Sequence, residues 1–247
     1  MADLRVPAIV LSRTVQSFRI LKRFGRALCG KELLQFRQVQ THTLSLGERD
    51  AQWTIRRAIL SPDSVIYSFG VGEDISFELA LIERFGVTIH AFDPTPRAIA
   101  WMRGQNLPPE LVFHPFGVGG VDGTCKFSPP RDPQHVSHSL VHRETPWPAI
   151  DVPICRLPTI CRELGHGRVD LLKMDIEGAE YEVVDDLLNS TIQVSQLLVE
   201  FHHRWPEIRP TRTREIVKRL NRAGYQIFHV SPSGDEYSFQ RAELPLG

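Results

Sequence analysis

Short apolar runs alternate with amphipathic stretches through the middle of the chain. Val65 to Phe69 is a β-branched and aromatic run that ends at Gly70, which predicts a strand and a turn. Residues 77–85 then carry apolar side chains at helical spacing and stop at Gly86, which is typical of a helix end. The alternation continues with an expected strand over 87–92, a helix over 97–103 and a strand over 111–114.

The same rhythm resumes in the last third of the chain. We expect a strand over 169–174, a helix over 178–188, a strand over 197–201 and a helix that begins near Thr211 or Thr213 and ends at Gly224. Two final strand-like runs, 225–230 and 237–241, are joined by Ser-Pro-Ser-Gly-Asp, which predicts a hairpin. Strands alternating with helices indicate an α/β fold, with a mostly parallel sheet covered on both faces and an antiparallel edge.

Two segments depart from this rhythm. Residues 118–158 hold seven prolines between Pro129 and Pro158, and a long Pro-rich segment inside a domain is usually a lid or binding loop. Residues 15–37 have basic residues between apolar ones at helical spacing, which predicts an amphipathic helix or helix pair. We therefore expect a basic helical extension over 1–60 and one α/β domain over 61–247.

Composition adds a charge asymmetry to this picture. With 247 residues, 42% apolar and 23% charged, the chain is globular, which excludes a disordered, collagen-like or coiled-coil protein. Its net charge is zero, but residues 1–40 contain eight basic residues and two acids, so the remainder carries −6. The basic segment is either a solvated helix packed on the core or an arm that contacts an anionic surface.

Cysteine usage and hydropathy bear on the compartment. Four cysteines without a C-x-x-C pair favour reduced thiols over a disulfide scaffold or a zinc site. No apolar run approaches the roughly 18 residues of a membrane helix, and Val6 to Leu11 is too short for a signal-peptide core. We expect a soluble, cytoplasmic protein.

The turn after the first strand of the domain predicts a ligand site. Gly70 and Gly72 permit a tight turn and close approach to the backbone, but Ile75 stands where a dinucleotide fingerprint has its third glycine. Glu73 and Asp74 would repel a phosphate at the helix N-terminus. S-adenosylmethionine (SAM) carries a sulfonium, an ammonium and no phosphate, so these charges favour it over NAD.

Asp93 ends the second strand, 21 residues after Gly72. An acid at that position can accept hydrogen bonds from ribose hydroxyls. The alternative is that Asp93 or Thr95 merely caps the helix that follows.

Three segments together resemble one family. Residues 68–74 (S-F-G-V-G-E-D), 92–96 (F-D-P-T-P) and above all 172–180 (L-K-M-D-I-E-G-A-E) resemble the motifs of FkbM-type methyltransferases, in the expected order from about residue 60 to the end. The resemblance implies a class I, Rossmann-like SAM-dependent methyltransferase with a seven-stranded sheet, and methylation of hydroxyls of sugars or secondary metabolites. Ser68 departs from the acid that most class I enzymes use to hold the cofactor's amino group. Glu73 and Asp74 are the candidates to replace it.

Methyl transfer to a hydroxyl needs alignment and a group that takes the proton. Asp175 ends the fourth strand, with Glu177 and Glu180 in the turn and first helical turn after it. These acids either serve the reaction or simply stabilise the helix N-terminus. Lys173 lies in an apolar strand, so it needs a partner; Glu200 is the candidate, and a ligand contact is the alternative.

The fifth strand ends Glu200-Phe201-His202-His203. Glu200 and His202 face one side, and a neutral His202 at the cleft is a candidate general base. Asp175, Glu200 and His202 could instead hold a divalent metal, although nothing in the spacing supports one, and ordinary packing is a third alternative. On the other side of the strand, His203 is a candidate substrate contact.

The Pro-rich insert supplies Ser137, His138 and Ser139, and the family resemblance extends to this S-x-S segment. As part of a lid, these residues would contact the acceptor. An irregular surface loop is the alternative.

The sequence therefore predicts a SAM-dependent O-methyltransferase. Asp175, Glu177 and His202 are the expected catalytic residues, and the cofactor is expected to contact Ser68, Gly70, Gly72, Glu73, Asp93 and Asp175. The expected partner is a small-molecule or glycan acceptor and no nucleic acid, and the oligomeric state stays open. The rivals are a nicotinamide-dependent reductase and a methyltransferase fold retained as a binding module.

Overall fold

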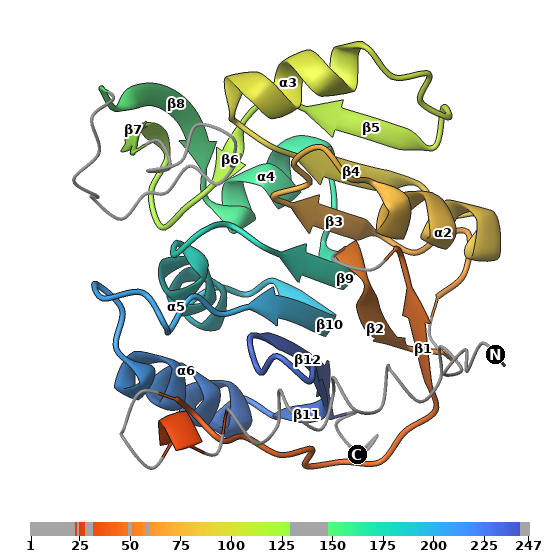
Figure 1. The fold of residues 1–247 in the computed structure, drawn as a ribbon. Helices are drawn as coiled ribbons and strands as arrows, with labels where there is room; N and C mark the ends of the chain where they lie inside the picture. The colour runs from red at the N-terminus through yellow and green to blue at the C-terminus, as the bar shows by residue number, and fades with distance from the viewer. Residues whose placement is uncertain are drawn as a thin grey trace, which may run out of the picture.

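The computed structural model describes residues 23, 25–27, 32–48, 51–57, 60–128 and 148–242. Within them, one mixed sheet has seven strands in the order β11-β12-β10-β9-β3-β4-β5 (Figure 1). In chain order these are β3 (Ile66–Phe69), β4 (Ile89–Phe92), β5 (Leu111–His114), β9 (Arg168–Met174), β10 (Gln193–Glu200), β11 (Tyr225–Val230) and β12 (Glu236–Arg241).

The sheet is parallel from β5 to β10, whereas β12 pairs antiparallel with both β10 and β11. The predicted parallel sheet with a C-terminal hairpin is therefore confirmed. Strand β10 begins four residues before the expected start at Leu197, because Gln193 to Gln196 extend the ladder with β9.

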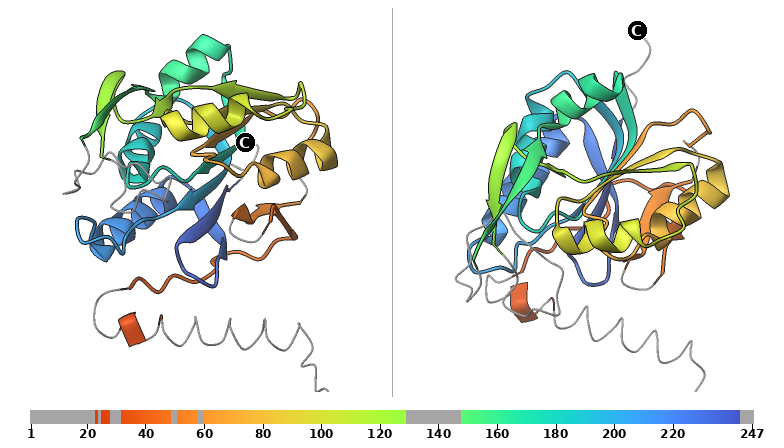
Figure 2. Two further views of the ribbon diagram at one scale, coloured as in Figure 1. Left: turned by 45° about the horizontal axis from the view of Figure 1, so that its top comes forward. Right: turned by 90° about the horizontal axis from the view of Figure 1, so that it is seen from above.

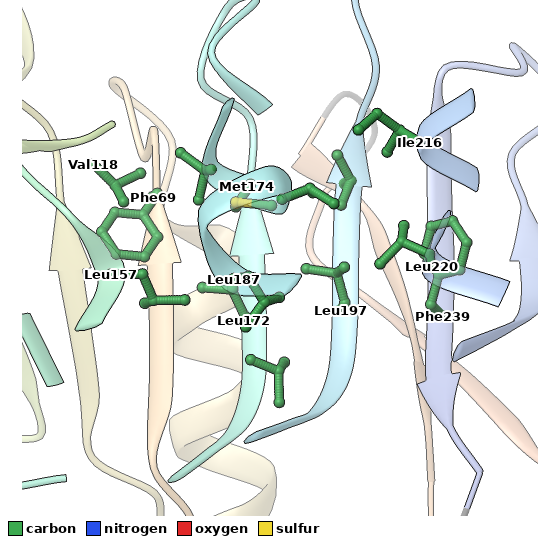
Figure 3. Packing of buried hydrophobic residues seen from close by; sticks show 14 of the residues in the cluster. Phe69, Val118, Leu157, Leu172, Met174, Leu187, Leu197, Ile216, Leu220 and Phe239 are labelled. Carbon is green, nitrogen blue, oxygen red and sulfur yellow. The ribbon is translucent and has the colours of Figure 1, made fainter. Parts of the chain in front are cut away.

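Helices cover both faces of the sheet, as expected. They are α2 (Ser76–Phe85), α3 (Pro96–Arg103), α4 (Leu157–Leu164), α5 (Glu180–Leu188) and α6 (Pro210–Arg222). Successive side chains of a strand point to opposite faces. Leu172 and Leu197 accordingly pack with α4, α5 and α6 (Figure 3), while Leu171 and Leu198 pack with α2 on the other side.

The strand order reverses at β3. The chain goes from β3 to β4 and β5 on one side, and later places β9 and β10 on the other. In open α/β sheets a ligand crevice forms at such a switch point, outside the carboxyl ends of the strands. The turns after β3, β4 and β9 meet there.

Residues before the main sheet form a hairpin and an extended segment, residues 32–38, which we call the N-terminal strap. Strands β1 (Thr43–Leu46) and β2 (Trp53–Arg56) pair antiparallel, and Trp53 and Ile55 are buried against the sheet. The expectation of a helical segment over 1–60 is thus wrong for 43–46 and 53–56, which are paired strands. Residues 33–38 are also not helical; Gln38 donates its backbone N–H to Ile227 O at 2.7 Å, so this segment runs beside β11 (Figure 2).

The described ends of the Pro-rich insert are ordered strands rather than an irregular loop. Strands β6 (Gly117–Val118), β7 (Gly123–Phe127) and β8 (Ile150–Cys155) form a small separate sheet in the order β6-β8-β7. Phe127, Val152 and Ile154 make its core. Gly117, Val118 and Phe127 of this sheet lie beside the crevice at the switch point.

In the part of the chain that the structure describes, no helix combines the length and the apolar composition that crossing a bilayer requires.

Candidate active site

The turn after β3 adopts the tight geometry expected from its glycines. Gly70 has φ +73° and Gly72 has φ +56°, a conformation that residues with a Cβ rarely adopt. A Cβ on Gly70 would also overlap the carbonyl oxygen of Asp175, so Gly70 allows the turns after β3 and β9 to touch. Gly70 therefore allows the two turns to pack together, and both glycines allow the tight turn that borders the crevice.

Asp93 lies at the centre of the crevice and its carboxylate is fixed in place. Oδ2 accepts from the Gly72 N–H at 3.0 Å, and Oδ1 accepts from the backbone N–H and the hydroxyl of Thr95 at 2.9 and 2.6 Å. Thr95 also caps α3, accepting from the Ala98 N–H. The structure therefore assigns the capping role to Thr95 and leaves a second lone pair on Asp93 Oδ2, the oxygen that accepts only the Gly72 N–H.

A pocket opens between the three turns and the small sheet. The residues that line it come from the β3 turn, the β4 end, the insert and the β9 turn: Gly70, Gly72, Asp93, Pro94, Thr95, Gly117, Val118, Phe127, Ile176, Glu177 and Ala179. Three predicted cofactor contacts, Gly70, Gly72 and Asp93, thus share one pocket.

The other predicted cofactor contacts near β3 do not line this pocket. Ser68 is buried and donates to Glu78 Oε1 at 2.5 Å, while Asp74 Oδ1 accepts from the Ser76 N–H at the start of α2. Glu73 forms an ion pair with Arg97, 2.7 Å apart, on the surface. The carboxylate that lies against Ser68 therefore comes from Glu78, not from Glu73 or Asp74.

Lys173 is buried, as its apolar strand implies, but Glu200 is not its partner. Its ammonium donates to Gly70 O at 2.8 Å and lies 5.5 Å from the centre of the Trp53 ring. Lys173 therefore fixes the carbonyl of the glycine turn, with a cation–π contact beneath it.

The turn after β9 carries unusual backbone geometry. Glu177 has φ +53°, the one described non-glycine residue with positive φ, and Gly178 follows with φ +100°. Such strain in a residue with a side chain is held by its surroundings and is common at functional sites. Glu177 lines the pocket, whereas the predicted cofactor contact Asp175 is not among the lining residues.

His202 joins three of the predicted acids in one cluster. Its Nδ1 lies 2.7 Å from Oε1 of the fully buried Glu180, and its Nε2 lies 3.3 Å from Glu177 and 3.8 Å from Asp175. Burial alone would lower the pKa of His202, but the negative charges of these carboxylates outweigh it and raise the pKa well above its ordinary value. The carboxylates around His202 therefore favour the protonated ring, which does not support the expected role of a neutral general base.

Glu200 completes the same cluster. Its pKa is raised to about 9 by burial and by the negative charge of Asp175. Asp175, Glu200 and His202 each offer one ligand atom, and these atoms all lie within 4.8 Å of one another. The three residues considered as metal ligands are therefore adjacent in space. Two of them, His202 and Asp175, also lie within 3.8 Å of each other as an ion pair.

His203 does not face the pocket, contrary to its predicted role as a substrate contact. It is buried, and its Nε2 lies 3.1 Å from Glu32 Oε1; Arg204 donates to Glu32 Oε2 from Nε at 2.9 Å and Nη2 at 2.7 Å. Burial tends to raise the pKa of Glu32, yet His203 and Arg204 lower it overall. His203 therefore anchors the N-terminal strap, because the strand alternation turns it away from His202.

Parts of two predictions lie outside the described residues. Ser137, His138 and Ser139 are among them, so the expected acceptor contacts of the insert stay a prediction. So do residues 1–22 of the basic arm; within its described part, Arg23 and Arg26 lie 3.9 Å from Glu32.

Sequence reasoning missed several residues of this region. Phe127 gave no signal, because nothing local shows that the small sheet returns to the pocket. Glu78 could have been found, since it falls on the face of α2 that carries Phe77 and Leu81 into the core. Glu32, more than 170 positions from His203, had no readable partner in the sequence.

Residues 39–227 match the family described as the Methyltransferase FkbM domain. Over 192 residues the chain is 26% identical to "Probable methyltransferase-like protein 24" of Rattus norvegicus, and over 191 residues 25% identical to the protein of that name from Homo sapiens. Each alignment covers 73% of this chain and 47% or 46% of the relative. The chain thus spans about half the length of the curated relatives it matches.

Proposed function

Because the chain belongs to the FkbM methyltransferase domain family, we propose that it is a SAM-dependent O-methyltransferase. Its acceptor in this proposal is a hydroxyl of a sugar-containing molecule or a small metabolite. The observation that carries the proposal is the pocket in which Asp93, the glycine turn and the Glu177 turn meet.

The chemistry of the pocket fits SAM better than a dinucleotide. At the N-terminus of α2, where a pyrophosphate would bind, the Ser76 N–H already donates to Asp74 Oδ1, and Glu73 precedes it in the same turn. Asp93 keeps a lone pair on Oδ2 that can accept a ribose hydroxyl, and no phosphate is needed for that contact. A cationic sulfonium and ammonium are compatible with the carboxylates around the pocket.

Bound SAM would supply a methyl group on a sulfonium, which is an excellent leaving group. The protein must then align the acceptor hydroxyl with that methyl and receive its proton. His202 is poorly suited to take a proton, because its raised pKa favours the ring that already carries one. We assign this role to a carboxylate oxygen of Glu177 or Asp175, which lie 3.3 and 3.8 Å from His202 Nε2. Phe127 and Val118 would exclude water from the same pocket.

Calorimetric titration with SAM and with S-adenosylhomocysteine tests the proposal. We expect one site per chain in the wild type and at least tenfold weaker binding in Asp93→Asn, which keeps the shape of the side chain. Asp151→Asn removes an exposed acid of the small sheet, paired with Lys126, and should bind as the wild type does. Equal affinity in Asp93→Asn, or no binding by the wild type, would overturn the assignment; tight binding of NADH instead would favour the reductase.

A binding module that does not catalyse transfer is the second candidate, suggested by Ser68. The Glu78 carboxylate, which accepts from Ser68 Oγ, supplies an acid in contact with this position, although neither residue lines the pocket. A transfer assay with methyl-labelled SAM across sugars and hydroxylated metabolites separates the two. SAM binding without labelled product over a broad panel would support the binding module.

A further inference from the structure

The ends of β9 and β10 bring together the donor atoms of a mixed oxygen and nitrogen site. Asp175 directly follows β9, Glu200 ends β10 and His202 follows two residues later. One ligand atom from each lies within 4.8 Å of the others. Bonds of about 2.0–2.4 Å to one divalent cation keep its ligand atoms within about 4.8 Å of each other. These pairwise distances are compatible with one ion shared by the three side chains.

His202 is oriented as a metal-binding imidazole is. Its Nδ1 lies 2.7 Å from Glu180 Oε1, so its Nε2 is directed at Asp175 and Glu177. Histidines that bind metals usually donate their second ring N–H to a carboxylate, which fixes the tautomer and the plane of the ring. Trp205 packs against the ring at 4.5 Å between centres and restrains it further.

Glu180 gives an independent sign that a cation belongs here. Its side chain is fully buried and its Oε1 serves both His202 and the Gly178 N–H, but its Oε2 has no hydrogen-bond partner among the described residues. Buried charges in proteins are paired or coordinate metals. Together with Asp175, Glu177 and Glu200, Glu180 gives the cluster four carboxyl groups around a single imidazole.

We propose that Asp175, Glu200 and His202 bind one divalent metal ion, with Glu180 as the residue that positions the imidazole. Two carboxylates and one imidazole suit Mn²⁺, Zn²⁺ or Mg²⁺. Glu177, which lies 3.3 Å from His202, also lines the pocket described above, so the ion would face that pocket. The site rests on these side chains alone and holds whether or not SAM is the ligand of the pocket.

Mn²⁺ alone is the probe for this site. Untagged protein is stripped with EDTA, dialysed and titrated with MnCl₂, and the signal of free Mn²⁺ is followed by electron paramagnetic resonance. We expect one ion per chain. Asp175→Asn and Glu200→Gln should each weaken binding at least tenfold, and Glu180→Gln about 10- to 100-fold as a positioning residue. Asp151→Asn, which removes an acid whose side chain is 62% exposed, should change the affinity less than twofold.

Two results would overturn the site: no loss of free Mn²⁺ signal at about 1 mM, the weak end of protein cation sites, or wild-type affinity in Asp175→Asn or Glu200→Gln. Circular dichroism checks the folding of each variant, and each of the two decides independently if the other misfolds. Since SAM is absent from this titration, a failure of the cofactor proposal leaves the Mn²⁺ result unchanged.

Discussion

His202 lies among carboxylates at the carboxyl end of the sheet, whereas His90 and His114 lie among rings on β4 and β5. His90 Nδ1 is 2.9 Å from His114 Nε2, and the His114 ring stacks on Phe92 with centres 4.5 Å apart. Burial, followed by the charges of His114 and His166, lowers the pKa of His90 to about 4. The pKa of His202 is raised instead, by the carboxylates of Glu180, Glu177 and Asp175. Burial is the main cause that lowers the pKa of His90 and of His114, whereas at His202 the neighbouring carboxylates outweigh burial and raise the pKa.

The two regions should limit stability from opposite sides of the pH range. A raised histidine pKa stabilises the fold below the unfolded value near 6.5, and this contribution is lost as pH rises through the folded pKa. A lowered histidine pKa stabilises the fold above 6.5, and the contribution is lost as pH falls toward 4. We therefore expect His202 to contribute to the loss of folding stability as pH rises, and His90 and His114 to contribute to the loss as pH falls.

The largest effect is expected from removing the acid that holds His202. Glu180→Ala leaves the buried ring of His202 without its nearest carboxylate, which should lower the free energy of unfolding by about 3–5 kcal/mol. Urea unfolding of EDTA-treated protein at pH 7 measures it. The exposed Glu182 on the same helix is the matched control, and Glu182→Ala should stay within about 0.5 kcal/mol of the wild type. Equal losses in both variants would contradict the pairing of Glu180 with His202.

An effect of intermediate size on the free energy of unfolding is expected from the titration of His90 below pH 6.5. As pH falls from 6.5 to 4, the lowered pKa of His90 should reduce the free energy of unfolding by up to about 3 kcal/mol, because the unfolded chain binds the proton first. His90→Gln cannot titrate in this range, so its unfolding free energy should fall less steeply over the same window. Urea unfolding at several pH values compares the slopes. The same slope in His90→Gln and wild type would remove His90 from this account.

The smallest effect is expected from breaking the solvent-exposed ion pair between Glu73 and Arg97. Glu73 and Arg97 lie 2.7 Å apart, but their side chains are 29% and 44% exposed. Arg97→Ala should therefore leave the free energy of unfolding close to that of the wild type. In calorimetry, Glu73→Gln should change SAM affinity less than twofold, since Glu73 does not line the pocket. A tenfold loss would restore Glu73 as a cofactor contact.

Much of the fold could be predicted because it depends on local patterns. The apolar runs that end at Phe69, Phe92 and Met174 are buried strands, and Gly86 ends its helix in the left-handed conformation. Asp93 and Asp175 could be placed for the same reason, since parallel strands bring their carboxyl ends to one edge. The hairpin formed by residues 43–46 and 53–56 was missed, because its strands are only four residues long and the sequence analysis grouped them with the basic extension.

The partners of the polar side chains could not be predicted in the same way. Lys173 needed a partner, and the neighbouring strand suggested Glu200; the structure gives it Gly70 O and the Trp53 ring instead. Gly70 and Trp53 are distant from Lys173 in the sequence. The exact register and twist of the sheet decide which groups the Lys173 ammonium contacts.

His202 and His203 show most directly where the two sources of information divide. The sequence by itself determined the α/β fold, the place of the crevice and the fact that these two side chains point to opposite sides, because periodicity and strand alternation are local properties. Only the tertiary structure decided that His202 meets Glu180 across a turn and that His203 meets Glu32 across more than 170 residues. Charge, protonation and ligand chemistry depend on such contacts within a few ångströms, and chain folding alone brings those atoms together.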